Sequence, residues 1–172
     1  MTPSTIGSID KLPEPEKRTI YARYIPRELV QKFDLPDLVQ DHDLLRFRYS
    51  ENASNVEMTI YHKADFPDPI LYAHLADTLN GQINVLLYIL NDPDSPRFDV
   101  DRMPDGSPTK FGIHNRNIQA ETSALEAGLA PGQLRRGLHL FRQAMASFEE
   151  FITFLGHDIY FVEPLHYHNA VI

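Results

Sequence analysis

The sequence predicts an α+β protein in which a long amphipathic helix covers a mostly antiparallel central sheet. Two patterns carry this prediction. Apolar and polar residues alternate in short stretches between residues 44 and 90, which is typical of half-buried strands. Between residues 134 and 155, apolar residues recur at alternating steps of four and three, the spacing of one face of a helix. The chain has 172 residues, which corresponds to about one domain.

Charge and composition exclude several functional classes. The formal net charge of −8 repels phosphate backbones, so we expect no nucleic-acid partner. The chain has no cysteine, which excludes disulfides, thiolate metal sites and cysteine nucleophiles and fits a cytoplasmic protein. The longest apolar run, Val85 to Leu90, is far shorter than the roughly 20 residues that span a bilayer. We therefore expect a cytoplasmic protein with no membrane partner.

The first half of the chain predicts a leader, one short helix and four strands. Residues 1–19 combine prolines with charges and have little apolar content, so they predict a flexible leader before a single domain at 20–172. Pro26 suits the first turn of a helix over 26–33. Strands are expected at 44–49, 56–62, 70–77 and 83–90. Asn80-Gly81 predicts a hairpin turn between the last two, and the almost wholly apolar 83–90 predicts a strand buried on both faces.

The second half predicts a loop, two helices and a final strand. Residues 91–114 hold four prolines and five aspartates, which indicates a long loop. A modest helix is expected at 117–127, stopped by Gly128, and the long helix at 133–155. A strand at 158–163 follows that helix, and a strand reached through a helix is expected to run parallel to an earlier strand.

The turn into the long helix is a candidate anion site. Glycines at a helix N-terminus let backbone N–H groups approach a phosphate, and the helix dipole favours negative charge. Two adjacent arginines add formal charge. The alternative is a simple turn glycine followed by solvated arginines. The residues of the candidate cradle are Gly132, Gln133, Leu134, Arg135, Arg136, Gly137 and Leu138.

The order of these features resembles the GNAT superfamily of N-acetyltransferases. In that family a proline- and glycine-bearing turn opens the central helix and binds the pyrophosphate of acetyl-CoA. Pro131, Gly137 and Leu138 stand at the family's spacing, and Asn169-Ala170 stands where its second motif begins. The resemblance spans roughly residues 44–172. It implies a GNAT-like fold without the family's C-terminal strands, a pyrophosphate on residues 132–138, and Asn169 beside the pantetheine arm.

The resemblance implies an acyl-CoA-dependent N-acyltransferase, most simply an acetyltransferase, that moves an acetyl group from acetyl-CoA to an amine substrate such as a small molecule. Acyl transfer to an amine needs a base for the ammonium and an acid for the departing thiolate. Glu163 is the candidate base and Tyr167 the candidate acid. The alternatives are an ordinary carboxylate at the end of a strand and a packed aromatic ring.

Two other functions stay open. The apolar stripe of the long helix could seat a partner, which would make the chain a non-catalytic interaction module on the same fold, and a homodimer is left open. His166 and His168 form a His-x-His pair that could share a metal with His114 or His157. No metal is favoured, because the sequence has no His-Glu-x-x-His motif.

Overall fold

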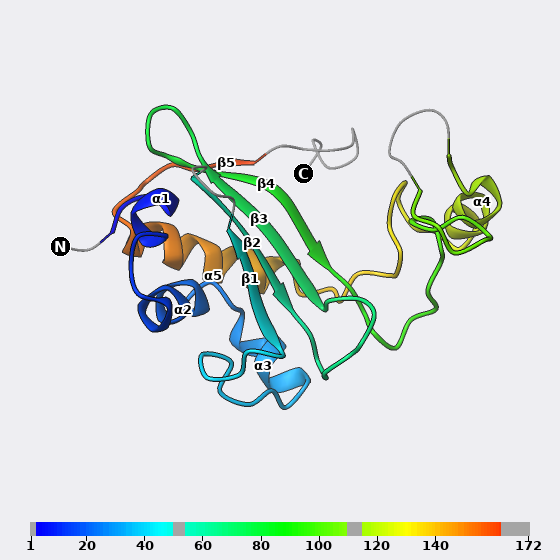
Figure 1. Ribbon diagram of the computed structural model, residues 1–172, viewed down its shortest axis with the longest axis horizontal. Coiled ribbons are helices and arrows are strands. Elements are labelled where there is room, and N and C mark those ends of the chain that lie inside the picture. Colours follow the sequence, from blue (N-terminus) through cyan, green and yellow to red (C-terminus); the bar gives the residue numbers. More distant parts are fainter. Residues whose placement is uncertain (1–2, 50–53, 110–114, 163–172) are drawn as a thin grey trace. The chain divides into compact units, whose positions relative to one another are not determined.

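The computed structural model describes residues 3–49, 54–109 and 115–162. The chain divides into two compact units, one formed by Met1–Leu90 with His139–Ile172 and the other by Asn91–Leu138 (Figure 1). The residues expected to form a single domain at 20–172 are divided between these two units, and residues 91–138 gather around a small core of their own. The first unit contains α1 (Ile6–Ile9), α2 (Glu14–Ala22), α3 (Arg27–Lys32), β1 (Leu45–Tyr49), β2 (Asn55–Ile60), β3 (Leu71–Asp77), β4 (Ile83–Leu90), α5 (Phe141–Phe154) and β5 (Phe161–Val162), and the second contains α4 (Ile118–Glu126).

The strands of the first unit form one sheet in the order β1-β2-β3-β4-β5. The first four strands pair antiparallel in succession. β5 pairs parallel to β4, with Asn84 opposite Phe161 and Val85 opposite Val162. The structure thus confirms a mixed α+β protein with a mostly antiparallel sheet, and it confirms the parallel final strand.

Local sequence decides the β3–β4 hairpin. The chain reverses at Asn80-Gly81, where Gly81 has a φ of +75°, and the Thr78 N–H donates to the Gln82 carbonyl at 2.7 Å. Glycine reaches this backbone region at no steric cost, which is why the turn was predictable. β4 itself differs from the expectation of burial on both faces, because its side chains from Leu86 to Leu90 are only half-buried.

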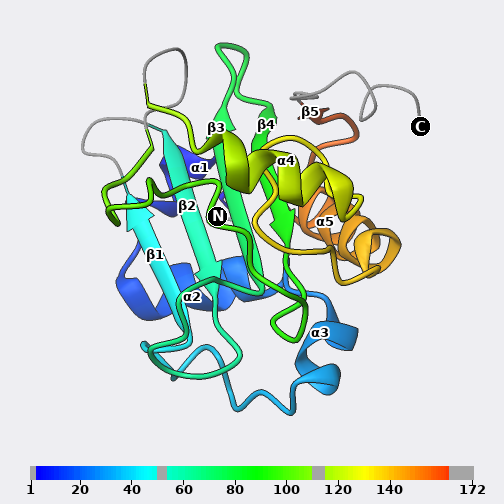
Figure 2. The same ribbon diagram turned by 90° about the vertical axis from the view of Figure 1, so that its right-hand side faces the viewer.

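Helices α1, α2 and α5 lie on one face of the sheet (Figure 2). Alternate strand residues such as Val56, Met58 and Ala73 point into this layer and are buried. Aromatic rings join the layer: the ring centroid of Tyr24, two residues after the end of α2, lies 5.1 Å from that of Phe148 and 6.0 Å from that of Phe151, both on α5. These contacts bury the apolar face of α5 inside the unit.

Residues 3–19, which the sequence predicts as a flexible leader, include α1 and the first part of α2, and α1 packs against β2 and β3. Ile6 and Ile9 of α1 are completely buried. The Asp77 carboxylate at the end of β3 accepts the N–H groups of Ile6 at 2.7 Å and Gly7 at 2.9 Å. A carboxylate at a helix N-terminus satisfies backbone donors that would otherwise lack partners. This tertiary contact, 70 residues away in sequence, outweighs the low apolar content of the segment.

Arg18 fixes α2 to the chain that enters β1. Its guanidinium is buried, and all of its hydrogen bonds go to backbone carbonyls: Nε to Val39 at 2.6 Å, Nη1 to Leu45 at 3.0 Å, and Nη2 to Leu38 and Asp41, both at 2.8 Å. A buried charge is tolerated when its donors are satisfied. One side chain therefore determines the path of residues 38–45.

The second unit has its own small core. Val100, Ala124 and Leu129 are buried together, and Phe98, Ala120, Ala127 and Leu134 pack against them. The expected helix at 117–127 is confirmed as α4, with Asn117 capping its start. The aspartates of the predicted loop form internal contacts, because Arg97 pairs with both Asp99 and Asp101.

The long helix predicted at 133–155 is wrong in its first third. α5 begins at Phe141, and residues 133–140 are not helical. The backbone here pairs with the second unit's own loop: Phe98 N–H donates to the Leu134 carbonyl and Asp92 N–H to the Arg136 carbonyl, both at 2.8 Å. Those carbonyls would accept from residues four positions later in a helix. Pairing between distant residues thus replaces the helical bonds that the apolar spacing suggests.

Arg18→Met tests the role of this arginine. The substitution keeps the apolar stem but leaves four carbonyls without their donor, so we expect the free energy of unfolding to fall by about 3 kcal/mol. Urea denaturation measures it. Arg27→Met, at an exposed position of α3, is the control and should change the free energy of unfolding by less than about 0.5 kcal/mol. Equal effects of the two substitutions would contradict the assignment.

Candidate functional site

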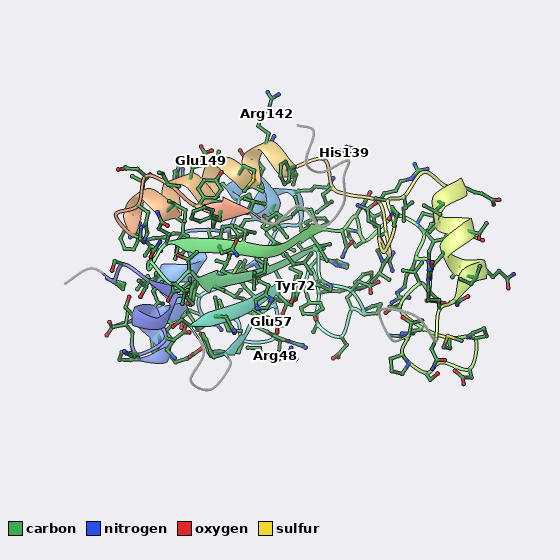
Figure 3. The ribbon with its side chains drawn as sticks, turned by 90° about the horizontal axis from the view of Figure 1, so that it is seen from above. Arg48, Glu57, Tyr72, His139, Arg142 and Glu149 are labelled. Atoms are coloured by element: carbon green, nitrogen blue, oxygen red, sulfur yellow. The ribbon has the colours of Figure 1, made fainter. Side chains whose placement is uncertain are left out.

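The start of α5 has the properties of an anion site. Its first backbone hydrogen bond within the helical pattern runs from Ala144 N–H to the Leu140 carbonyl, at 2.9 Å, so the N–H groups of Phe141, Arg142 and Gln143 lack helical partners. Leu140 provides no side-chain cap, and the first turn contains no acidic residue. Its one charged residue, Arg142, is exposed and projects outward (Figure 3). A cation in a first turn opposes the helix dipole, and an anion beside it would offset both the dipole and the arginine charge.

The sequence-predicted cradle does not lie at a helix N-terminus. Gly132, Gln133, Leu134, Arg135, Arg136, Gly137 and Leu138 all belong to the second unit and precede α5. Arg135 is buried, and its Nη1 donates to the carbonyls of Pro93 and Ser95. The Arg136 N–H donates to the Ser95 hydroxyl at 3.2 Å. The argument for an anion at residues 132–138 was that they open a helix, and they do not. The helix begins at Phe141, so the same argument applies there.

Several predicted residues lie outside the described part of the chain. These are Glu163, Tyr167 and Asn169 of the proposed acyltransferase site, and His114, His166 and His168 of the alternative metal site. His157 is described, and its Nε2 lies at hydrogen-bonding distance from the Ser4 carbonyl. Among residues 3–49, 54–109 and 115–162, no group of three or more His, Asp or Glu side chains is arranged to hold a metal ion.

A second polar cluster lies on the sheet face opposite α1, α2 and α5. Arg48 of β1 donates to the Glu57 Oε1 of β2 from Nε at 3.1 Å and from Nη2 at 2.6 Å. Tyr72 of β3 lies beside them (Figure 3). The side chain of Glu57 is 21% exposed and that of Arg48 is 78% exposed. The carboxylate is thus the inner group and the guanidinium the outer one.

Tyr72 is electrostatically linked to this carboxylate. Burial, followed by the negative charge and hydrogen bond of Glu57, raises the pKa of Tyr72 to about 12. Burial and charge act in the same direction here, because both disfavour the phenolate. The phenol therefore stays protonated at neutral pH.

Sequence reasoning missed this cluster. Each strand shows the expected alternation, but the residues that share a face across strands depend on the register. The register places Arg48 opposite Glu57 and Glu57 opposite His74. The alternation of apolar and basic residues at 45–49 was the one local signal, and it indicated a polar face without identifying its partners.

Comparisons with known proteins return no match to this chain, whether with protein-family models, with curated proteins or with solved structures. The function is thus inferred from the chain itself. In the described residues no helix is long and apolar enough to cross a membrane.

Glu57→Gln tests the electrostatic link to Tyr72. Removing the negative charge should lower the pKa of Tyr72 from about 12 toward 10, measured from its ring signals by NMR between pH 8 and 13. Tyr49 is the internal control, because burial and the charges of Glu14 and Asp10, but not Glu57, raise its pKa.

The same shift predicts a pH dependence of stability. The pKa of Tyr72 is higher in the folded chain than in free tyrosine. The contribution of its protonated phenol to the free energy of unfolding is therefore complete below pH 10 and is lost as the pH rises toward 12. Tyr72→Phe should remove that part of the alkaline loss of stability, measured by urea denaturation at pH 8 and 11. An unchanged slope would contradict the link.

Proposed function

We propose that this chain is an acyl-CoA-dependent N-acyltransferase of GNAT-like fold that transfers an acetyl group from acetyl-CoA to an amine. The observation that carries the proposal is the parallel pairing of β5 with β4, reached through α5, after four antiparallel strands. This order of elements is the one that the sequence resemblance implies. It supports the proposal independently of the turn at 132–138.

The pyrophosphate of acetyl-CoA is proposed to bind at the start of α5. The N–H groups of Phe141, Arg142 and Gln143 donate to its oxygens, and the Arg142 guanidinium adds formal charge. The proposed position of the pyrophosphate is therefore the start of α5 and not the sequence-predicted turn at 132–138.

The chemistry needs two proton transfers and an exposed thioester. Glu163 follows directly after β5 in the sequence and is proposed as the base that deprotonates the amine. Tyr167 is proposed to protonate the departing thiolate, and Asn169 to bind the pantetheine arm. The nitrogen lone pair then attacks the thioester carbonyl, the new amide bond forms and the C–S bond breaks.

The interaction-module alternative depended on a free apolar stripe along the long helix. Phe148, Ile152 and Leu155 of that stripe are buried within the first unit. Leu138 is also buried but belongs to the second unit. The stripe is therefore not one continuous surface for a partner, and this favours the enzyme over the module.

Acetyl-CoA binding is the direct test. Acetyl-CoA at 100 times its dissociation constant should stabilise the folded chain by about 2.7 kcal/mol, which a thermal melt detects. Arg142→Ala should weaken binding about tenfold, since it removes a charge-assisted contact to phosphate. Transfer itself is measured as release of the CoA thiol in the presence of an amine.

Two variants control this experiment. Arg27→Ala removes an arginine from the first turn of α3 and should leave acetyl-CoA binding unchanged. Arg136→Ala removes an exposed arginine of the sequence-predicted turn. If Arg136→Ala weakens acetyl-CoA binding and Arg142→Ala does not, the pyrophosphate binds at the turn at 132–138 and not at the start of α5. No stabilisation by acetyl-CoA in a chain that melts cooperatively would overturn the proposed function.

A further inference from the structure

A row of side chains crosses four strands on the sheet face opposite α5. Arg48 of β1 stands opposite Glu57 of β2, Glu57 opposite His74 of β3, and His74 opposite Leu87 of β4. Directly opposed residues of antiparallel strands have Cβ atoms about 4.5–5.5 Å apart, so the members of the row are neighbours on this face of the sheet. The row therefore leads from an exposed cation, through a carboxylate, to an imidazole.

His74 ends this polar row without a partner for one of its nitrogens. Its Nε2 atom is buried and makes no hydrogen bond within the part of the chain that the structure describes. A buried nitrogen that lacks a hydrogen bond is costly, and such groups in native proteins mark strain, an ion, a water molecule or a ligand. The β-bulge between His74 and Leu75 also alters the register with β4 at this point.

The charges around His74 select the kind of ligand. The groups that face it are Glu57 on β2 and, along its own strand, Tyr72, while β4 presents the apolar Leu87. Arg48 is mostly exposed, so solvent screens its charge, whereas Glu57 is mostly buried. Of the two residues opposed to His74 on the neighbouring strands, the charged one is thus Glu57. A cation is attracted there and an anion is repelled.

We propose that Glu57 and His74 form a binding site for a primary ammonium group. The ammonium donates an N–H to His74 Nε2, and Glu57 supplies the opposite charge. The Arg48–Glu57 pair opens at little cost, because salt bridges with so exposed a partner contribute little stability. In combination with the proposed function, on which this reading rests, the ammonium is that of the acyl acceptor, so the acceptor is a cationic amine.

Binding of matched four-carbon probes to the full chain tests the site. The probes are 1-aminobutane, butanoate and 1-butanol, added to protein without acetyl-CoA, with the NMR signals of the His74 and Leu87 amides as the readout. We expect saturable shifts with 1-aminobutane and none with the other two. Saturable shifts with butanoate instead would overturn the proposal in favour of an anion at Arg48, and equal shifts with all three would mean an apolar contact only and overturn it as well.

Substitutions separate binding from folding. His74→Phe and Glu57→Gln should each weaken 1-aminobutane binding at least fivefold, while His42→Phe, at an exposed position outside the sheet, should not. Since Nε2 has no partner to lose, His74→Phe should leave the melting temperature unchanged or raise it. A lower melting temperature would show that His74 has a structural partner and would overturn the proposal.

The acetyl-CoA affinity of the same variants distinguishes this inference from the proposed function. His74→Phe should leave the dissociation constant for acetyl-CoA unchanged, because the ammonium site contacts the acceptor and not the cofactor. Amine binding without acetyl-CoA binding would overturn the acyltransferase and retain the ammonium site. If acetyl-CoA binds and its thiol is released, but substitutions of His74 and Glu57 do not change amine binding, the acyltransferase is retained and the ammonium site is overturned.

Discussion

The buried guanidinium of Arg18 is the constraint on which the first unit depends. Four carbonyls between Leu38 and Leu45 converge on it, so the chain between α3 and β1 can take only one path. That path sets the start of β1 and, through it, the register of the sheet. It also orients α2, whose Tyr21, with Tyr24 just after the helix, forms one side of the aromatic core with α5. In these four bonds the guanidinium has no carboxylate partner, and it also lies over the Phe47 ring, 5.5 Å from its centroid.

The sheet built on this frame has two unlike faces. One face is covered by helices and contains the aromatic core. The other carries the row Arg48, Glu57 and His74, whose members are exposed or half-buried. The start of α5, with three N–H groups that lack helical partners and one arginine, belongs to the same unit. The first unit by itself thus contains both proposed sites, the one for pyrophosphate at the start of α5 and the one for an ammonium at Glu57 and His74.

Much of the fold was predictable, and the reasons are local. All four antiparallel strands were expected within one or two residues of their observed bounds, because alternation and turn glycines act within a few residues. For the candidate site, the sequence predicted the type of site but not its position. The idea of an anion at the start of the last long helix came from the sequence, but its position did not. Apolar spacing continues through residues 134–140, and nothing in it reveals that the carbonyls of Leu134 and Arg136 accept from residues 98 and 92.

The sequence by itself determined the α+β class, the β3–β4 turn and the parallel final strand, since each follows from periodicity, glycine chemistry or the presence of a connecting helix. Tertiary structure decided the features that need distant partners. Asp77 turns a proline-rich leader into a buried helix, the loop at residues 91–98 holds residues 134–136 out of α5, and strand register brings Glu57 to His74. The physical reason is the same in each case: a backbone or buried polar group takes the partner that the fold provides, and that partner lies too far along the chain for local patterns to reveal it.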